Sequence, residues 1–229
     1  MPYAGDTSAF TKWKQAIWNT YPKFSLTDTF KFSCHNGLKC FTQCCADVNI
    51  FLTPYDILRM KRALQMTSEE FLANYTEVLT PDGRGFPAVL LKMREDKLKT
   101  CPFVSEKGCA IYGDRPWGCR MYPVGMASPD RNNLTDREDV YFLVDQEFPC
   151  HGFNEEKHWT VAEWKRSQGV EEYELKGGAY KDITLHSFFL EGNRLNAQKS
   201  EIFYMACYDM DRFKRFVFDS TFLNRFDIA

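Results

Sequence analysis

The sequence lacks the features that identify several large classes of protein. Among its 229 residues, 29 Lys and Arg face 31 Asp and Glu, which leaves a formal net charge of −2. A nucleic-acid-binding surface needs a surplus of basic residues, so we expect no nucleic-acid partner. No apolar run is long enough to span a bilayer, and no basic patch is present to attract a membrane surface, so we expect no membrane partner either.

Targeting and catalytic motifs are also missing. The first residues show no charged start followed by an apolar run and a small-residue cleavage site, so we expect a cytoplasmic protein. There is no Gly-rich phosphate loop, no G-x-S-x-G and no H-E-x-x-H, so no common catalytic signature is available. The sequence does not decide whether the chain is an enzyme.

Cysteine, by contrast, is plentiful and clustered. Of the nine cysteines, four lie in FSCHNGLKCFTQCCAD, three in KTCPFVSEKGCAIYGDRPWGCRMYP and one in FPCHGF. An odd count without an export signal argues against a disulfide scaffold, and dense thiols in a reducing compartment indicate metal binding. The candidate metal ligands are Cys34, Cys40, Cys44, Cys45, Cys101, Cys109, Cys119 and Cys150.

The spacing of these cysteines bears on the kind of metal centre. Cys40 and Cys44 would share one face of a helix, whereas the adjacent Cys45 must point elsewhere. This pair therefore indicates either two metal positions or one ligand beside one packed thiol. The steps from Cys101 to Cys109 and on to Cys119 are eight and ten residues, too wide for a C-x-x-C zinc knuckle.

Eight thiolates can supply two four-cysteine sites, of either zinc or iron–sulfur type. The wide spacings favour an iron–sulfur cluster of the [4Fe–4S] type. So does the Cys-Pro step at Cys101, which also closes the ferredoxin cluster run. Zinc stays an open alternative.

Other residues near the cysteines have weaker claims. Cys207 lies at helical spacing among apolar residues and is predicted to be a packed core thiol. His35 and His151 each flank a cysteine and could bind the metal or donate a hydrogen bond to a thiolate. Arg115 and Arg120 lie on either side of Cys119 and are candidates for binding the cofactor by offsetting its negative charge, the alternative being ordinary pairs with carboxylates.

The predicted fold is α+β and mostly helical. With 44% hydrophobic and 16% aromatic residues, the chain can bury a substantial core. We expect one domain over residues 1–229. Residues 32–170 would form an irregular cysteine-rich metal-binding region with a small β element. Residues 178–229 would form a helical layer over a separate hydrophobic core.

Capping signals place several helices. Thr53 before Pro54 marks one start, and capping boxes pair Thr67 with Glu70 and Thr160 with Glu163. Further helices are expected over about 8–19 and, after two adjacent glycines, over the aromatic C-terminal region, where RFKRFVF reads as an amphipathic helix. PAVLLKM and LKTCPFV are predicted as strands on either side of an REDK turn, and VYFLVD as another strand, with loops over 80–86 and 127–139.

The ordered motifs C…C-x-x-x-C-C, C-P-F, C-A-I-Y-G-D-R-P-x-x-C-R-x-Y-P and C-H-G-F resemble those of the bacterial YkgJ-type cysteine-cluster family, over roughly residues 32–170. The resemblance implies a zinc- or iron-chelating domain whose cysteine positions are the eight named above. Its most characteristic stretch is matched by Asp114, Arg115, Pro116, Arg120 and Pro123. The chain departs from the family in the longer gap between Cys34 and Cys40, and in His151, which stands where a proline is common.

The leading hypothesis is a cytoplasmic metal-binding protein whose iron–sulfur or zinc centre is mainly structural and supports a binding or maturation role. Its partner would be an unidentified protein or small molecule. One alternative is an enzyme, either an iron–sulfur redox protein or a protein-modifying transferase. The transferase follows from a further resemblance to the cysteine-rich part of flagellin lysine methylases. A metal chaperone is the third hypothesis.

Overall fold

Threonine caps decide where three helices begin. In the computed structural model, which describes residues 21–79, 85–127, 139–144 and 150–225, each of these caps forms a complete capping box. The hydroxyl accepts from the backbone three residues on, and the acidic side chain there accepts from the threonine backbone. Thr53 starts α2 (Pro54–Ala63), Thr67 starts α3 (Ser68–Tyr75) and Thr160 starts α5 (Val161–Ser167), so all three predicted starts are confirmed.

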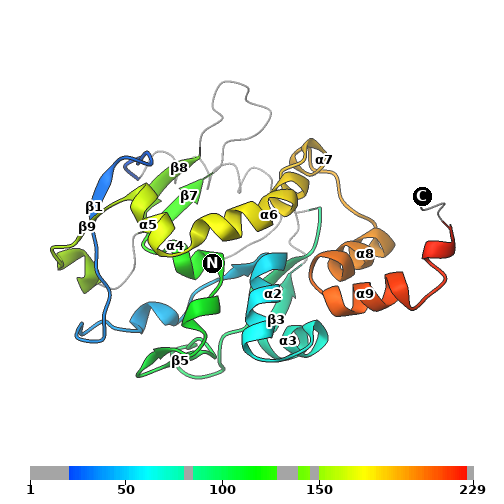
Figure 1. The fold of residues 1–229 in the computed structure, drawn as a ribbon, viewed down its shortest axis with the longest axis horizontal. Coiled ribbons are helices and arrows are strands. Elements are labelled where there is room, and N and C mark those ends of the chain that lie inside the picture. Colours follow the sequence, from blue (N-terminus) through cyan, green and yellow to red (C-terminus); the bar gives the residue numbers. More distant parts are fainter. Residues whose placement is uncertain (1–20, 80–84, 128–138, 145–149, 226–229) are drawn as a thin grey trace.

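The remaining helices follow the cysteine region or lie within it. These are α4 (Trp117–Met121), α6 (Val170–Thr184), α7 (Ser187–Leu190), α8 (Ala197–Cys207) and α9 (Met210–Phe218). Short 3₁₀ turns occur at Gln43–Cys45, Tyr112–Asp114, His151–Asn154 and Leu223–Arg225. Helices outweigh strands, which confirms the predicted α+β, mostly helical class, and α6 runs between α5 and α7 across the middle of the view in Figure 1.

The strands form four small antiparallel sheets. The largest has the order β2 (Phe51–Leu52), β4 (Ala88–Leu91), β3 (Thr76–Leu79), and the two-stranded pairs are β1 (Thr29–Lys31) with β9 (His158–Thr160), β5 (Val104–Ser105) with β6 (Gly108–Cys109), and β7 (Val124–Ala127) with β8 (Val140–Leu143). The pairing of β1 with β9 therefore joins the segment before Cys34 to the segment after Cys150.

Two hydrophobic clusters form the interior. The first, called here the sheet core, joins α2, α3 and the three-stranded sheet, with Ile57, Met60 and Phe71 fully buried. The second cluster is called the ribbon core. It joins β1, β7 and β8 with α4 and α5, and within it the rings of Phe32 and Trp164 meet edge to face.

Three expectations about the fold were wrong. LKTCPFV does not pair with the PAVLLKM strand, because β4 is already paired on both edges by β2 and β3, the second of which the sequence did not reveal. Gly177 and Gly178 lie inside α6 instead of before a helix. Their unfavourable propensity, about 1 kcal/mol each relative to alanine, is overridden by packing at the buried start of the helix. The aromatic C-terminal region is helical, as predicted, and forms α8 and α9.

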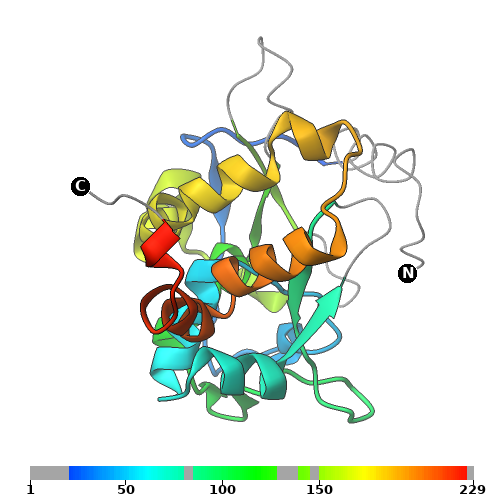
Figure 2. The same cartoon turned by 90° about the vertical axis from the view of Figure 1, so that its right-hand side faces the viewer.

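The third correction concerns the C-terminal layer. Tyr208, at the end of α8, is fully buried in the same sheet core as Phe103 and Ile111 of the cysteine region, so the layer does not cover a separate core. Figure 2 shows α9 lying beside α3, with α8 packed on α9. The predicted helix over 8–19 and most of the two predicted loops lie outside the described residues.

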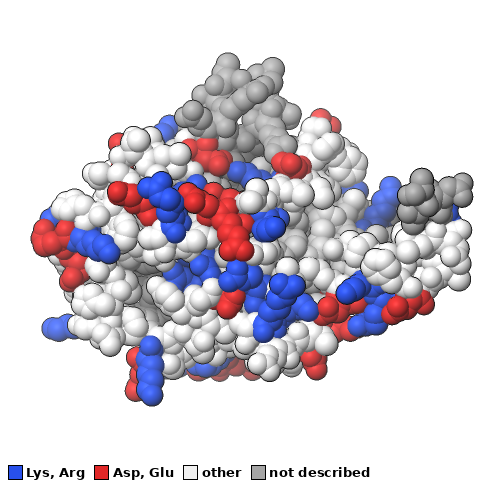
Figure 3. Space-filling model, in the orientation of Figure 1, with Lys and Arg blue, Asp and Glu red and all other residues white. Residues whose placement is uncertain are grey.

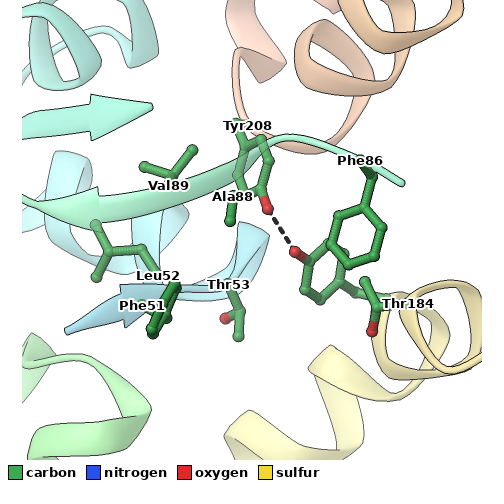
Figure 4. Close-up of a pocket in the computed structure, with 9 residues that line it drawn as sticks. Phe51, Leu52, Thr53, Phe86, Ala88, Val89, Thr184 and Tyr208 are labelled. Atoms are coloured by element: carbon green, nitrogen blue, oxygen red, sulfur yellow. Dashed lines mark hydrogen bonds between the residues drawn. The ribbon is translucent and has the colours of Figure 1, made fainter. Parts of the chain in front are cut away.

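A small cavity of about 120 Å³ opens between the sheet and the helical layer. Its lining residues are Phe51, Leu52, Thr53, Phe86, Ala88, Val89, Tyr180, Thr184 and Tyr208 (Figure 4). The Tyr180 and Tyr208 hydroxyls are hydrogen-bonded to each other across it. None of the lining residues is a cysteine, so this cavity is distinct from the thiol-rich part of the molecule.

On the face drawn in Figure 3, basic and acidic side chains are interspersed and do not gather into one patch of a single sign. Among the described residues, no helix has the length and apolarity needed to cross a bilayer.

Candidate metal centre

Backbone hydrogen bonds bring the first cysteine segment to Cys150. Phe32 N–H donates to the Lys157 carbonyl at 2.9 Å, and Ser33 N–H donates to the Gly152 carbonyl at 3.0 Å. The backbone N–H of His151 donates to the Cys40 sulfur at 3.2 Å. These bonds hold the segment of Cys34 and Cys40 beside the segment of Cys150, which lies more than a hundred positions further along the chain.

A second set of bonds ties the other end of the same segment to the second cysteine segment. Cys101 N–H donates to the Cys45 carbonyl at 2.8 Å, next to a β-bridge between Ala46 and Thr100. Cys101 is held at the base of the β5–β6 hairpin by the bond from Val104 N–H to its carbonyl, 3.2 Å long, and Cys109 lies directly opposite Val104. Cys119 follows on α4.

The electrostatic neighbours of the thiols divide them into two groups of four. Burial raises the pKa of Cys34 to about 11, and the charges of Cys44, Cys150 and Cys40 add to the rise. Burial likewise raises the pKa of Cys119 to about 12, with contributions from Cys101 and Cys109. The first thiol group is therefore Cys34, Cys40, Cys44 and Cys150. The second thiol group is Cys45, Cys101, Cys109 and Cys119.

The division runs between two adjacent residues. A hydrogen bond from Cys45 lowers the pKa of Cys44 to about 7, while the same bond, burial and the charges of Cys44, Cys101 and Cys119 raise the pKa of Cys45. The chain reverses here through Thr42, whose φ of 68° is rare for a β-branched residue. Cys44 and Cys45 thus affect each other's pKa most strongly, and Cys101 and Cys119 also act on the pKa of Cys45.

The two arginines next to Cys119 have different surroundings. Arg120 donates through Nε to the Arg115 carbonyl at 2.9 Å, through one terminal nitrogen to the Gln168 carbonyl at 2.6 Å, and through the other to the Gly113 carbonyl. All three guanidinium nitrogens of Arg120 therefore donate to backbone carbonyls, which favours a positioning role for this residue over direct contact with a cofactor.

Arg115, unlike Arg120, has a nitrogen without a hydrogen-bond partner. Its guanidinium lies 3.7 Å from the centre of the Tyr112 ring and donates to the Gln168 side chain, yet its Nε is buried without a hydrogen-bond partner. The residue is 9% exposed, and its charge acts on thiols of both groups. The neighbouring Asp114 pairs with Arg59 at 2.7 Å instead.

The remaining sequence candidates are placed as follows. The side chains of His35 and Glu155 are 3.3 Å apart on the surface. His151 contributes its backbone N–H to Cys40. Cys207 packs against the sheet core, away from both thiol groups, and burial raises its pKa to about 11.

Sequence reasoning missed two residues of the site. The Tyr122 hydroxyl is buried without a partner at hydrogen-bonding geometry, and burial together with the adjacent Cys150 thiol raises the pKa of Tyr122. Its signal was present in the C-R-x-Y-P motif. The buried Asp56 carboxylate accepts from Trp117 N–H at 2.7 Å and so fixes the start of α4. Only its capping role could have been found in the sequence.

The donor chemistry fits a soft metal, because the cysteine-rich region supplies eight free thiols. As placed here, no three His, Cys, Asp or Glu side chains of the described residues converge closely enough to enclose an ion. The fit therefore rests on the identity and grouping of the donors and not on a closed coordination geometry.

Comparison with known proteins agrees with this chemistry. Residues 33–140 match the model of the CxxCxxCC family, whose description reads "Putative zinc- or iron-chelating domain". The match covers a little less than half of the chain and lies in its cysteine-rich region. The resemblance recognised in the sequence is thereby confirmed, and metal binding with it. Cys150 lies beyond the part of the CxxCxxCC domain that is matched, so its place beside Cys40 is a finding of the structure. Searches of curated proteins and of solved structures gave no match.

Proposed function

We propose that the protein holds two metal centres, each bound by four thiolates, and that both centres mainly fix the fold of the cysteine region. The observation that supports this most is a pair of hydrogen bonds: His151 N–H donates to the Cys40 sulfur at 3.2 Å, next to Cys150, and Cys101 N–H donates to the Cys45 carbonyl at 2.8 Å. Four thiolates complete a tetrahedral zinc site or ligate one [4Fe–4S] cluster.

The ligands of each centre come from segments far apart in the chain. The first thiol group joins residues near 40 to Cys150, and the second joins Cys45 to the segment from Cys101 to Cys119. A metal at either place would cross-link loops that contain little regular secondary structure. This is the arrangement expected of a structural centre that supports binding of another molecule or its maturation.

The iron–sulfur cluster is the first candidate for the bound group, because the wide ligand spacings and the Cys-Pro step resemble cluster-binding loops. Zinc is the second candidate. When bound, either group would be coordinated by thiolates of the chain and would cross-link the loops that carry them. The chain's own residues hold the loops, through Arg120 and Asp56, and place a positive charge beside the thiols, through Arg115.

Metal analysis of protein purified without oxygen tests the proposal. Brown protein with iron and sulfide would establish clusters, and colourless protein with two zinc ions would establish paired tetrahedral sites. Cys44→Ser and Cys45→Ser should each remove one centre and leave the other, with Cys207→Ser as the control that removes neither. Loss of the same centre in both variants would contradict the proposal.

A further inference from the structure

The cavity between the three-stranded sheet and the helical layer has apolar and firmly packed walls. Leu52, Ala88 and Val89 form its sheet side, and each is at most 2% exposed. Tyr208, at the end of α8, belongs to its helical side and is fully buried. Figure 4 shows the Tyr208 hydroxyl pointing in among the lining residues, on the side of Phe86. Walls packed in this way keep the volume between them open, because their side chains have little freedom to move into it.

The polar atoms of the lining are hydrogen-bonded within the protein, and none is charged. The Tyr180 and Tyr208 hydroxyls bond to each other. The Thr53 hydroxyl donates to a carboxylate at the start of α2 at 2.8 Å, and the Thr184 hydroxyl donates to a carbonyl at the end of α6 at 3.3 Å. No Asp, Glu, Lys, Arg or His occurs among the nine described residues that line the cavity. A charged ligand would therefore lose its hydration here without meeting an opposite charge, whereas an uncharged ligand would not.

The volume sets the size of the ligand. An apolar cavity of about 150 Å³ accepts benzene, and this cavity measures about 120 Å³. It meets the surface beside Phe51, which lines it and is 40% exposed. A single six-membered ring therefore fits between the walls, and a small substituent on it can point outward.

Aromatic side chains favour an aromatic ligand over other apolar molecules of this size. The Phe86 ring lies with its centre 4.9 Å from that of Phe189 and 5.5 Å from that of Phe203, so it is held in place from behind. Phe86, Tyr180 and Tyr208 thus present three ring surfaces to the cavity. Aromatic rings attract one another in edge-to-face and offset arrangements, beyond the area that they bury.

We infer that this cavity binds a small, uncharged molecule built on one aromatic ring. Binding removes the apolar surface of the ligand from water and supplies the lining with dispersion contacts that an empty volume lacks. No bond is made or broken. None of the lining residues is a cysteine, so the site does not depend on the two proposed metal centres.

Titration of the full chain with benzene, followed by the NMR signals of methyl groups, tests the site. The methyl groups of Leu52, Ala88 and Val89 should shift in a saturable way, with a dissociation constant on the order of 1 mM for so small a ligand. Those of Leu175, a side chain of α6 that is 78% exposed, should not shift. Benzoate has a similar ring but a negative charge, and it should bind about tenfold more weakly or worse.

A filled cavity provides the second arm of the test. Thr184→Phe adds a ring to the lining at the end of α6 and should weaken benzene binding by about tenfold or more, because the same space cannot hold two rings. Ile183→Phe is the matched control. It adds the same ring at the preceding residue, which is 46% exposed and does not line the cavity, so the affinity should not change.

Several outcomes would overturn the inference. Among them are the absence of a saturable shift at the three wall residues up to the solubility of benzene, and an equal shift at Leu175. Equal affinities for benzene and benzoate would also contradict it, as would equal affinities of Thr184→Phe and the unaltered chain. If Thr184→Phe fails to fold, the comparison of benzene with benzoate in the unaltered chain still decides.

Discussion

Arg115 illustrates how a single residue can serve two sites. It is buried, stacked on Tyr112 and bonded to Gln168, and its charge lowers the pKa of thiols in both groups. Four thiolates around a divalent ion leave a net negative charge, and two such centres repel one another. A buried guanidinium offsets part of that repulsion.

We predict that Arg115→Gln weakens zinc binding at both centres by about tenfold, because an opposite charge near a thiolate is commonly worth about one pKa unit or more. Competition with a chromophoric chelator measures the two affinities. Arg115→Lys keeps the charge and should recover most of the loss. Arg94→Gln is a matched control, since Arg94 lowers the pKa of Cys101 and is not among the charges that act on Cys34 or Cys44. Equal affinities for Arg115→Gln and the unaltered chain would contradict a role in charge compensation.

The thiol pKa values lead to a second prediction at this scale. With pKa values of about 11 and 12, Cys34 and Cys119 are protonated in the metal-free protein at pH 8. A metal binds the thiolate, so loading must expel these protons, and affinity must rise with pH. Calorimetry of zinc binding in two buffers of different ionisation enthalpy should show net proton release. Uptake of protons, or none exchanged, would contradict the assignment of these thiols as ligands.

Sequence patterns identified the residues better than their partners. Nine cysteines could be divided into eight candidates and one packed thiol, and Cys207 indeed packs on the sheet core. The pairing of Asp114 with Arg59, and the free Nε of Arg115, depend on which elements meet across the fold. Such contacts leave no periodic trace in a sequence.

At the scale of elements, Asp56 joins two helices that belong to different parts of the site. One carboxylate oxygen accepts from the Thr53 backbone at 2.7 Å and from its hydroxyl, and the other accepts from Trp117 N–H at 2.7 Å. The start of α4, two residues before Cys119, is therefore fixed by the start of α2.

Asp56→Asn should lower the free energy of unfolding by about 1–3 kcal/mol, because asparagine has one acceptor oxygen and its amide would face a buried donor. Urea unfolding monitored by tryptophan fluorescence measures the change. Glu70→Gln alters the exposed capping box of α3, where glutamine is tolerated, and should cost much less. A similar loss in the two variants would show that Asp56 only caps α2.

Local signals predicted helix starts well and strand pairing poorly. A cap needs only the residues within one turn, so Thr53, Thr67 and Thr160 were sufficient. The partners of β4, which are β2 and β3, flank it in the sheet, and burial of the whole strand decides the pairing. The turn between PAVLLKM and LKTCPFV therefore does not predict which strands pair.

At the scale of the molecule, each thiol group borders one hydrophobic core. Cys150 and Tyr122 pack on the ribbon core, and Cys101 and Cys109 pack on the sheet core. The sequence could supply the cysteines and the apolar residues. It could not show that metal ligands and core residues share the same boundaries, because that follows only from the packing of distant segments.

This arrangement predicts what metal removal does. The sheet core contains Ile57, Met60 and Phe71, all fully buried on α2 and α3, outside the two cysteine segments. The metal-free protein should therefore stay folded there, while the loops that hold the cysteines lose their cross-links. The stability lost on chelation should be about 4 kcal/mol where free metal exceeds the dissociation constant a thousandfold. Hydrogen exchange should rise over 33–47 and 100–120 and stay slow over α2 and α8. Uniform unfolding on chelation would mean that the cores cannot form alone, and unchanged exchange over the cysteine loops would mean that the centres are not structural.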